Sequence, residues 1–231
     1  MTRRVGASSP RVGATSPRLQ VLPAESGTRG ALAWQLADEQ AEPWPCLSSA
    51  SVGGGLGAAS WVLNVGVVRD YRRTDLEAHA AEVAASAGLR GEGTALLTAA
   101  DVHRVEASEC SGVRAWSTVG VSRPTWPADP EALARAGRRL PPGTINTVVL
   151  LPVRLTPSAL IQAALVVAEA KAQACVESGL PGTGTASDAV VLACDPAGPV
   201  EDFGGPRSTW GARVALSVHT GVAAGLAGWS P

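Results

Sequence analysis

The chain has 231 residues, with 19 Lys and Arg against 20 Asp and Glu, and its formal net charge is −1. Because no basic block interrupts the chain after residue 20, binding to nucleic acid or to an anionic membrane surface is not expected. Hydrophobic residues make up 45% of the chain, so it can bury a core. This length fits one layered domain with a tail.

Cysteine spacing and apolar runs exclude several further classes of protein. The four cysteines, at positions 46, 110, 175 and 194, have no C-x-x-C spacing, and the three histidines are scattered. This pattern argues against a structural zinc site and fits free thiols in a reducing cytoplasm. No continuous run of 18 apolar residues predicts a membrane-spanning helix, and no apolar segment follows the N-terminal arginines as in a secretory signal. We therefore expect a cytoplasmic protein.

The first 18 residues are predicted to be a disordered tail. They contain a near-duplicate, RVGASSP at 4–10 and RVGATSP at 11–17, with no acidic residue. Such a segment buries too little apolar area to offset the entropy of ordering it. The folded domain is therefore expected at 19–231.

The first half of this domain is predicted to contain three strands and a helix. Apolar runs predict strands at 61–68, 94–98 and 113–119. Between the first two, residues 74–87 predict a helix in which Thr74 and Glu77 form a capping box and Gly88 ends the last turn.

The second half is predicted to alternate in the same way. Residues 147–153 and 189–194 predict buried strands. Thr156 and Pro157 suit the N-cap and first position of a long apolar helix that ends near Ser178. A last helix is expected from Ser208 or Thr209 to about residue 226. Interleaved strands and helices predict an α/β or layered α+β fold, a single domain with a sheet core between two layers of helix.

Four turns rich in Gly, Ser and Thr adjoin these buried elements, at 48–57, 98–102, 143–146 and 182–188. Glycine lets backbone N–H groups approach a ligand, and short polar side chains add hydrogen bonds. None is a nucleotide loop, because the last turn lacks Gly-Lys-Ser/Thr and Ser60 replaces the final glycine of a G-x-G-x-x-G pattern. The alternative for each single turn is a tight loop between packed elements.

These turns belong to an ordered series of blocks that resembles the adenosylcobinamide amidohydrolase family of corrinoid salvage. The resemblance covers roughly residues 45–225, and the order and spacing of the blocks are more specific than any one of them. One departure is Ser187, where the family is expected to have Thr, but the hydroxyl is kept. The blocks are SSASVGGG (48–55), VLN (62–64), LLTAADV (96–102), STVGVSRP (117–124), GTIN (143–146), EAKAQA (169–174) and GTGTASDAVV (182–191).

The resemblance implies hydrolysis of the amide that joins aminopropanol to a propionate side chain of the corrin in adenosylcobinamide. The products would be adenosylcobyric acid and aminopropanol. Cobalt arrives inside the substrate, so neither a protein-bound metal nor another cofactor is expected, and the oligomeric state stays open. We expect the turns and their neighbours to bind the substrate through Ser48, Ser49, Gly53, Gly54, Asn64, Thr98, Asp101, Asn146, Lys171, Thr183, Thr185 and Ser187.

The nucleophile is a separate question, because no Ser-His-Asp pattern is visible. The layout of residues 140–194 resembles half of the aminopeptidase and ornithine acetyltransferase superfamily, whose members cut their own chain before a Ser or Thr. That resemblance implies that Thr144 is the nucleophile. The amides of Asn64 or Asn146, or the backbone at 98–99, are candidates for the oxyanion hole.

Several alternatives stay open. Thr144 could simply start a strand, or its hydroxyl could act in an intact chain with Asp188 or Glu169 as base. Glu169 could equally belong to a solvent-facing helix stripe with Gln173 and Glu177. Asp101 and Asp188 could each be a turn former or helix cap.

Two rival functions also remain. One is a corrinoid-binding module without turnover, which would need the glycine-rich turns but no nucleophile. The other is a self-processing aminopeptidase or acyltransferase that uses a threonine nucleophile.

Overall fold

The computed structural model describes residues 17–25, 27–131, 134, 143–227 and 229. Most of the predicted tail, residues 1–16, lies outside the described residues. Pro17 is buried, and its carbonyl accepts a hydrogen bond from Arg114 Nη1 at 3.0 Å. Packing against the domain therefore includes a residue before the predicted boundary at 19.

Two sheets form the centre of the molecule. The four-stranded sheet has the order β1-β2-β5-β6, and only β5 and β6 are parallel. The six-stranded sheet has the order β4-β3-β11-β9-β8-β7, and only β9 and β11 are parallel. The strands are β1 (Leu19–Leu22), β2 (Ala31–Gln35), β5 (Trp61–Gly66) and β6 (Gly93–Thr98) in the first, and β3 (Trp44–Ser48), β4 (Gly55–Ala59), β7 (Glu106–Cys110), β8 (Val113–Gly120), β9 (Thr144–Leu151) and β11 (Ala189–Cys194) in the second. A short parallel pair, β10 (Arg154–Leu155) with β12 (Val200–Glu201), lies apart.

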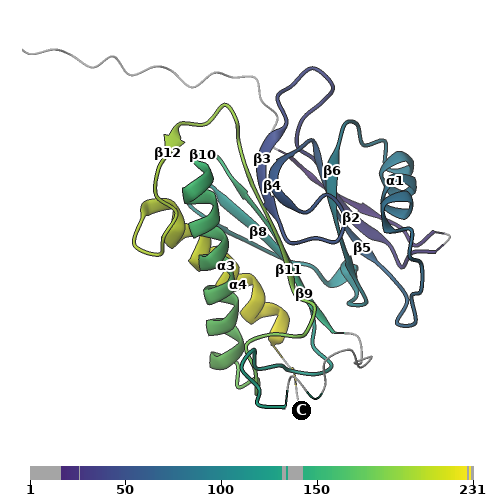
Figure 1. The fold of residues 1–231 in the computed structure, drawn as a ribbon, viewed down its shortest axis with the longest axis vertical. Helices are drawn as coiled ribbons and strands as arrows, with labels where there is room; N and C mark the ends of the chain where they lie inside the picture. Colours follow the sequence, from purple (N-terminus) through teal and green to yellow (C-terminus); the bar gives the residue numbers. More distant parts are fainter. Residues whose placement is uncertain (1–16, 26, 132–133, 135–142, 228, 230–231) are drawn as a thin grey trace, which may run out of the picture.

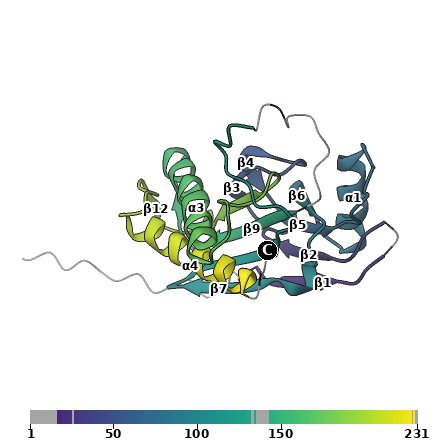
Figure 2. The ribbon, with the colours of Figure 1, turned by 90° about the horizontal axis from the view of Figure 1, so that it is seen from below.

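Helices cover the outer face of each sheet, which gives four layers (Figures 1 and 2). Helix α1 (Leu76–Ser86) packs on the four-stranded sheet. Helices α3 (Pro157–Glu177) and α4 (Thr209–Leu226) pack on the six-stranded sheet and on each other. A single 3₁₀ turn, η1 (Val102–Arg104), follows β6. The α/β class is confirmed, but two facing sheets replace the expected single one.

Strand alternation builds the apolar layer between the sheets. Every second residue of β2, β3, β8 and β9 points into it, including Trp34, Trp44, Trp116 and Leu150. The Trp34 and Trp116 rings lie 5.4 Å apart at an interplanar angle of 57°. Further along the same strands the inward positions Thr118, Thr144 and Asn146 are polar, and they lie beside the turns that carry the predicted site.

Most of the predicted elements are confirmed, with shifted ends. Thr156 caps α3 through a bond from the Ala159 backbone N–H at 3.4 Å, and Ser208 caps α4 through a bond from the Gly211 backbone N–H at 3.0 Å. The capping box of Thr74 is wrong, because α1 begins after Asp75 and no side chain caps it.

The stretch at 48–57 is a hairpin and not a plain turn, because Ser48 ends β3 and Gly55 begins β4. Strands as short and as rich in Gly and Pro as these carry little period-2 signal.

One helix among the described residues, α3, is long and apolar enough to cross a membrane by length and composition. It packs beside α4 on the six-stranded sheet, and Ala163 and Ala174 on its inner face are fully buried. Those contacts account for the apolar residues on its inner face, whereas Ile161, Leu165 and Val176 are exposed.

Candidate active site

The Gly143 carbonyl and the Thr144 hydroxyl meet the turn at residues 182–188 where β9 begins. The Ser187 hydroxyl donates to the Gly143 carbonyl oxygen at 2.9 Å and lies 3.1 Å from Thr144 Oγ1. The Thr185 hydroxyl lies 2.7 Å from the same carbonyl oxygen. Two hydroxyls thus face one carbonyl, an arrangement that can stabilise negative charge on its oxygen.

Asp188 anchors this turn to β9 through both carboxylate oxygens. Its Oδ1 accepts a bond from the Ile145 backbone N–H at 2.8 Å and lies 2.5 Å from Thr185 Oγ1. Its Oδ2 accepts bonds from the Thr185 backbone N–H at 3.0 Å and from Lys171 Nζ at 2.5 Å. A Cβ on Gly184 would overlap both Asp188 Oδ2 and Lys171 Nζ, so the turn requires glycine there. With this many donors, the Asp188 carboxylate is better placed to anchor the turn than to accept a proton.

Asn64 and Asn146 join the two sheets through their side-chain amides. Asn146 Nδ2 donates to Asn64 Oδ1 at 2.9 Å and to the Leu97 carbonyl oxygen at 3.2 Å. Asn64 Nδ2 donates to Thr118 Oγ1 at 3.0 Å. Asn146 lies two residues from Thr144 on the same face of β9, so these amides border the hydroxyl junction.

The hairpin residues predicted to bind substrate have structural partners. The Ser48 and Thr94 hydroxyls lie 2.8 Å apart and link β3 to β6. Ser49 Oγ accepts a bond from the Val190 backbone N–H at 2.9 Å. Gly53 has φ +62°, and a Cβ on it or on Gly54 would overlap a backbone carbonyl oxygen. Close backbone packing is therefore sufficient to require both glycines.

Four other predicted residues lie outside the hydroxyl junction. Thr98 is buried, and its Oγ1 accepts a bond from the Ala100 backbone N–H at 3.0 Å. Asp101 is exposed and caps η1, as its alternative interpretation expected. The Thr183 backbone N–H donates to a loop carbonyl at 3.0 Å. Glu169 is exposed on α3, in line with the hydrogen-bonded pair of Gln173 and Glu177.

The tertiary structure therefore brings Thr144, Thr185, Ser187, Asp188 and Lys171 together and sets Asn64 and Asn146 beside them. Sequence reasoning missed Thr118, although it lies in one of the blocks; its place two residues after the buried Trp116 on β8 was the signal available. Within the described residues, no three His, Cys, Asp or Glu side chains are arranged to hold a metal ion.

The sequence model of the adenosylcobinamide amidohydrolases matches residues 28–231. The chain belongs to the adenosylcobinamide amidohydrolase family. A relative of that name from Halobacterium salinarum is 32% identical over 193 residues, which cover 81% of this chain and 83% of the relative. Another from Methanosarcina mazei is 29% identical over 187 residues, covering 77% of this chain and 88% of the relative. The resemblance of the sequence blocks to this family is thereby confirmed, and the hydroxyl junction falls inside the matched region.

Proposed function

We propose that this chain hydrolyses the amide that joins aminopropanol to the corrin in adenosylcobinamide, releasing adenosylcobyric acid for cobalamin salvage. The family match and the names of two relatives support this substrate. The observation that carries the chemistry is the junction at Gly143 and Thr144, where a hydroxyl nucleophile lies beside donors that already face a carbonyl.

Thr144 is the nucleophile in this proposal. Its Oγ1 attacks the carbonyl carbon of the substrate amide, the C–N bond breaks, and aminopropanol leaves with the hydroxyl proton. Water then hydrolyses the ester on Thr144, which releases adenosylcobyric acid and restores the hydroxyl. The Ser187 hydroxyl is the nearby donor suited to the oxyanion, and the single proton of Thr185 is shared between that position and Asp188 Oδ1.

A second proposal is that the chain first cleaves itself between Gly143 and Thr144. Among the described residues, no carboxylate, imidazole or amine contacts the Thr144 hydroxyl, whose partner there is Ser187. Thr144 is also only 5% exposed while its peptide bond is intact. Cleavage would supply the missing base as the new α-amine, and it would remove the Gly143 carbonyl from the donors that the substrate carbonyl needs.

Self-cleavage needs no co-reactant other than water. Thr144 Oγ1 attacks the Gly143 carbonyl carbon, the peptide C–N bond breaks, and the nitrogen takes the hydroxyl proton. Water hydrolyses the resulting ester to leave a carboxylate on Gly143 and a free amine on Thr144. The Ser187 and Thr185 hydroxyls face the oxygen that becomes negative in this step.

Incubation of the purified protein with adenosylcobinamide, followed by mass analysis of the corrinoids, tests the first proposal. A product with the mass of adenosylcobyric acid is expected, and unchanged substrate that stays tightly bound would favour the non-catalytic corrinoid-binding module. Intact-protein mass spectrometry of the same sample tests the second. Two chains, 1–143 and 144–231, are expected, and turnover by a single intact chain would refute self-cleavage.

The expectations about cofactors and about cellular location are also proposals. Cobalt enters as part of the substrate, and the chain's own hydroxyl and amine groups are assigned the chemistry, so turnover is expected to persist after dialysis against a chelator. We also propose a cytoplasmic location, on the grounds of the free thiols at all four cysteines. Cell fractionation tests this location.

A further inference from the structure

Asn146 is a fully buried polar residue close to the proposed nucleophile. The residue is 0% exposed. Its side chain points into the layer between the sheets, at the next inward-facing position of β9 after Thr144. Neither its backbone position nor its side chain has access to bulk water. Every polar atom of this amide therefore needs a partner inside the molecule or on a ligand.

The orientation of this amide follows from its partners. The Leu97 carbonyl oxygen can only accept a hydrogen bond, and it lies 3.2 Å from Asn146 Nδ2. The nitrogen must therefore face Leu97, and its second N–H goes to Asn64 Oδ1 at 2.9 Å. Both N–H groups of Asn146 are thus used within the protein.

The oxygen of the same amide differs from its nitrogen. Within the described part of the chain, Asn146 Oδ1 is buried and accepts no hydrogen bond. Buried acceptors without a partner are rare in native proteins, and each one asks for an explanation. Here the unpaired oxygen belongs to the residue next to Thr144 on the inward face of β9.

This inventory decides which role Asn146 can have. A group in an oxyanion hole must donate, and Asn146 has no N–H left to donate. Its free oxygen suits a donor instead. In the reaction proposed for Thr144, the substrate group at the scissile bond that donates is the amide N–H, whereas its carbonyl oxygen is an acceptor.

We propose that Asn146 Oδ1 accepts a hydrogen bond from the N–H of the scissile amide and so makes the site specific for an amide over an ester. This inference rests on the proposed function and deepens it. Asn64 and the Leu97 carbonyl position the Asn146 amide, and Thr118 in turn receives the hydrogen bond from Asn64. The oxyanion is then left to the Ser187 hydroxyl, with the Thr185 proton shared between the oxyanion and Asp188 Oδ1.

The test compares adenosylcobinamide with the ester in which oxygen replaces the amide nitrogen, since that ester has no N–H. Replacing Asn146 by alanine (N146A) is expected to lower kcat/KM for the amide by about tenfold or more and for the ester by less than about threefold. A fall by the same factor for both substrates would overturn the proposal.

A matched control separates recognition from packing. Thr118→Val breaks the same hydrogen-bonded chain but leaves Asn146 Oδ1 in place, so it is expected to change the amide and the ester by equal factors. Circular dichroism and thermal melting check that each variant folds. If N146A does not fold, N146L removes the same oxygen at a similar volume and is expected to shift the ratio of amide to ester turnover toward the ester; an unchanged ratio would overturn the proposal.

Failure of the proposed function and failure of the role of Asn146 give different results. If the wild-type chain turns over neither substrate, the proposed function fails and the inference about Asn146 fails with it. If the wild type hydrolyses the amide but N146A loses both substrates equally, the function stands and only the role of Asn146 is refuted.

Discussion

The layer between the two sheets has an apolar end and a polar end, and the same strands build both. At the apolar end, the rings of Trp34 and Trp116 lie 5.4 Å apart and belong to the same cluster as Val148 of β9. Two and four residues earlier on β9, Asn146 and Thr144 face the same layer. Alternation puts all three β9 residues on one face, so side-chain chemistry alone separates the core from the site.

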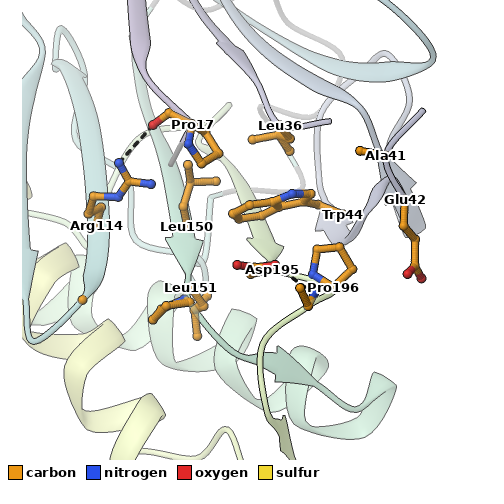
Figure 3. A pocket seen from close by; sticks show the side chains of 13 residues that line it. Pro17, Leu36, Ala41, Glu42, Trp44, Arg114, Leu150, Leu151, Asp195 and Pro196 are labelled. Atoms are coloured by element: carbon orange, nitrogen blue, oxygen red, sulfur yellow. Dashed lines mark hydrogen bonds between the residues drawn. The ribbon is translucent and has the colours of Figure 1, made fainter. Parts of the chain in front are cut away.

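The volume of the cavities does not indicate which end of the layer holds the reactive side chains. A pocket of about 300 Å³ opens beside the apolar end, walled by Trp44 and Leu150, with Arg114 at one edge bonded to the Pro17 carbonyl (Figure 3). None of its lining residues is Ser, Thr, Cys or His. Burial lowers the pKa of the Arg114 guanidinium, and the carboxylates of Glu42 and Asp195 also line this pocket.

The polar end has the reactive groups, and a smaller pocket lies near them but outside the layer between the sheets. A pocket of about 200 Å³ adjoins the Lys171–Asp188 pair, on the face of β9 opposite to Thr144. Hydroxyl groups that converge on a carbonyl therefore locate the site better than the volume of a pocket does. Substitutions at each end should then have different consequences.

Thr144→Ala is expected to have the largest effect. Loss of the nucleophile should lower turnover of adenosylcobinamide by more than about a thousandfold, and it should leave the chain uncut at Gly143. Product mass and intact-protein mass measure both. Thr147→Val is the matched control, because Thr147 is a buried threonine of the same strand on the opposite face, bonded to Ser117. Undiminished turnover by Thr144→Ala would show that the reaction does not depend on the polar end.

Trp34→Ala should act on stability and not on chemistry. Trp34 is 0% exposed, so truncating it is expected to cost about 3–5 kcal/mol in the free energy of unfolding, measured by denaturant titration. Trp126→Ala, at a tryptophan 49% exposed, should change that free energy by less than about 0.5 kcal/mol. A turnover defect in folded Trp34→Ala would show that the two ends are coupled.

Asp188→Asn should have an intermediate effect that originates at the polar end. Its carboxylate pairs with Lys171 at 2.5 Å, with 11% and 19% of the two side chains exposed, so removing the negative charge leaves a mostly buried cation unpaired. A loss of about 2–3 kcal/mol in the free energy of unfolding is expected. Adding Lys171→Met should recover part of that loss in a double-mutant cycle, and full additivity would mean that the pair is not coupled.

The smallest expected effect is the reactivity of Cys46, which lies in the apolar end. Burial raises its pKa to about 12, with a smaller contribution from Cys194. At pH 8 only about one thiol in ten thousand is then ionised, so iodoacetamide should leave Cys46 unmodified in the folded chain. Cys110, half-buried on the edge strand β7, is the internal control in peptide mapping. Rapid alkylation of Cys46 would mean that the apolar end opens.

The strongest local signals in the sequence predicted the structure well. Thr156-Pro157 began a helix and Gly179 lies just past its end with φ +77°. The apolar run of β9 was found, although it begins at Thr144 and not at residue 147. Short strands such as β3 and β4 were missed, because Gly and Pro remove the alternation by which a strand is detected.

The site was predictable in its members more than in their arrangement. Thr185, Ser187 and Asp188 lie within one turn, so the chain itself brings them together. That Asp188 is saturated with donors, and that Glu169 faces solvent, depends on how α3 packs against β9 and β11. Periodicity on a nearly uniform apolar helix left the direction of Glu169 open, and no local pattern shows that Asp188 reaches Ile145 and Lys171.

The sequence by itself determined the family, the interleaved elements and the hydroxyl-rich turns, because these depend on residue order and on local backbone preference. Only the tertiary structure decided that two sheets face each other, since the partner of a strand face is set by packing between segments far apart in the chain. It also decided that both N–H groups of Asn146 donate hydrogen bonds, one to Asn64 and one to Leu97. Hydrogen bonds between residues 49 and 82 positions apart leave no trace in any local pattern, and they turn an expected donor into an acceptor.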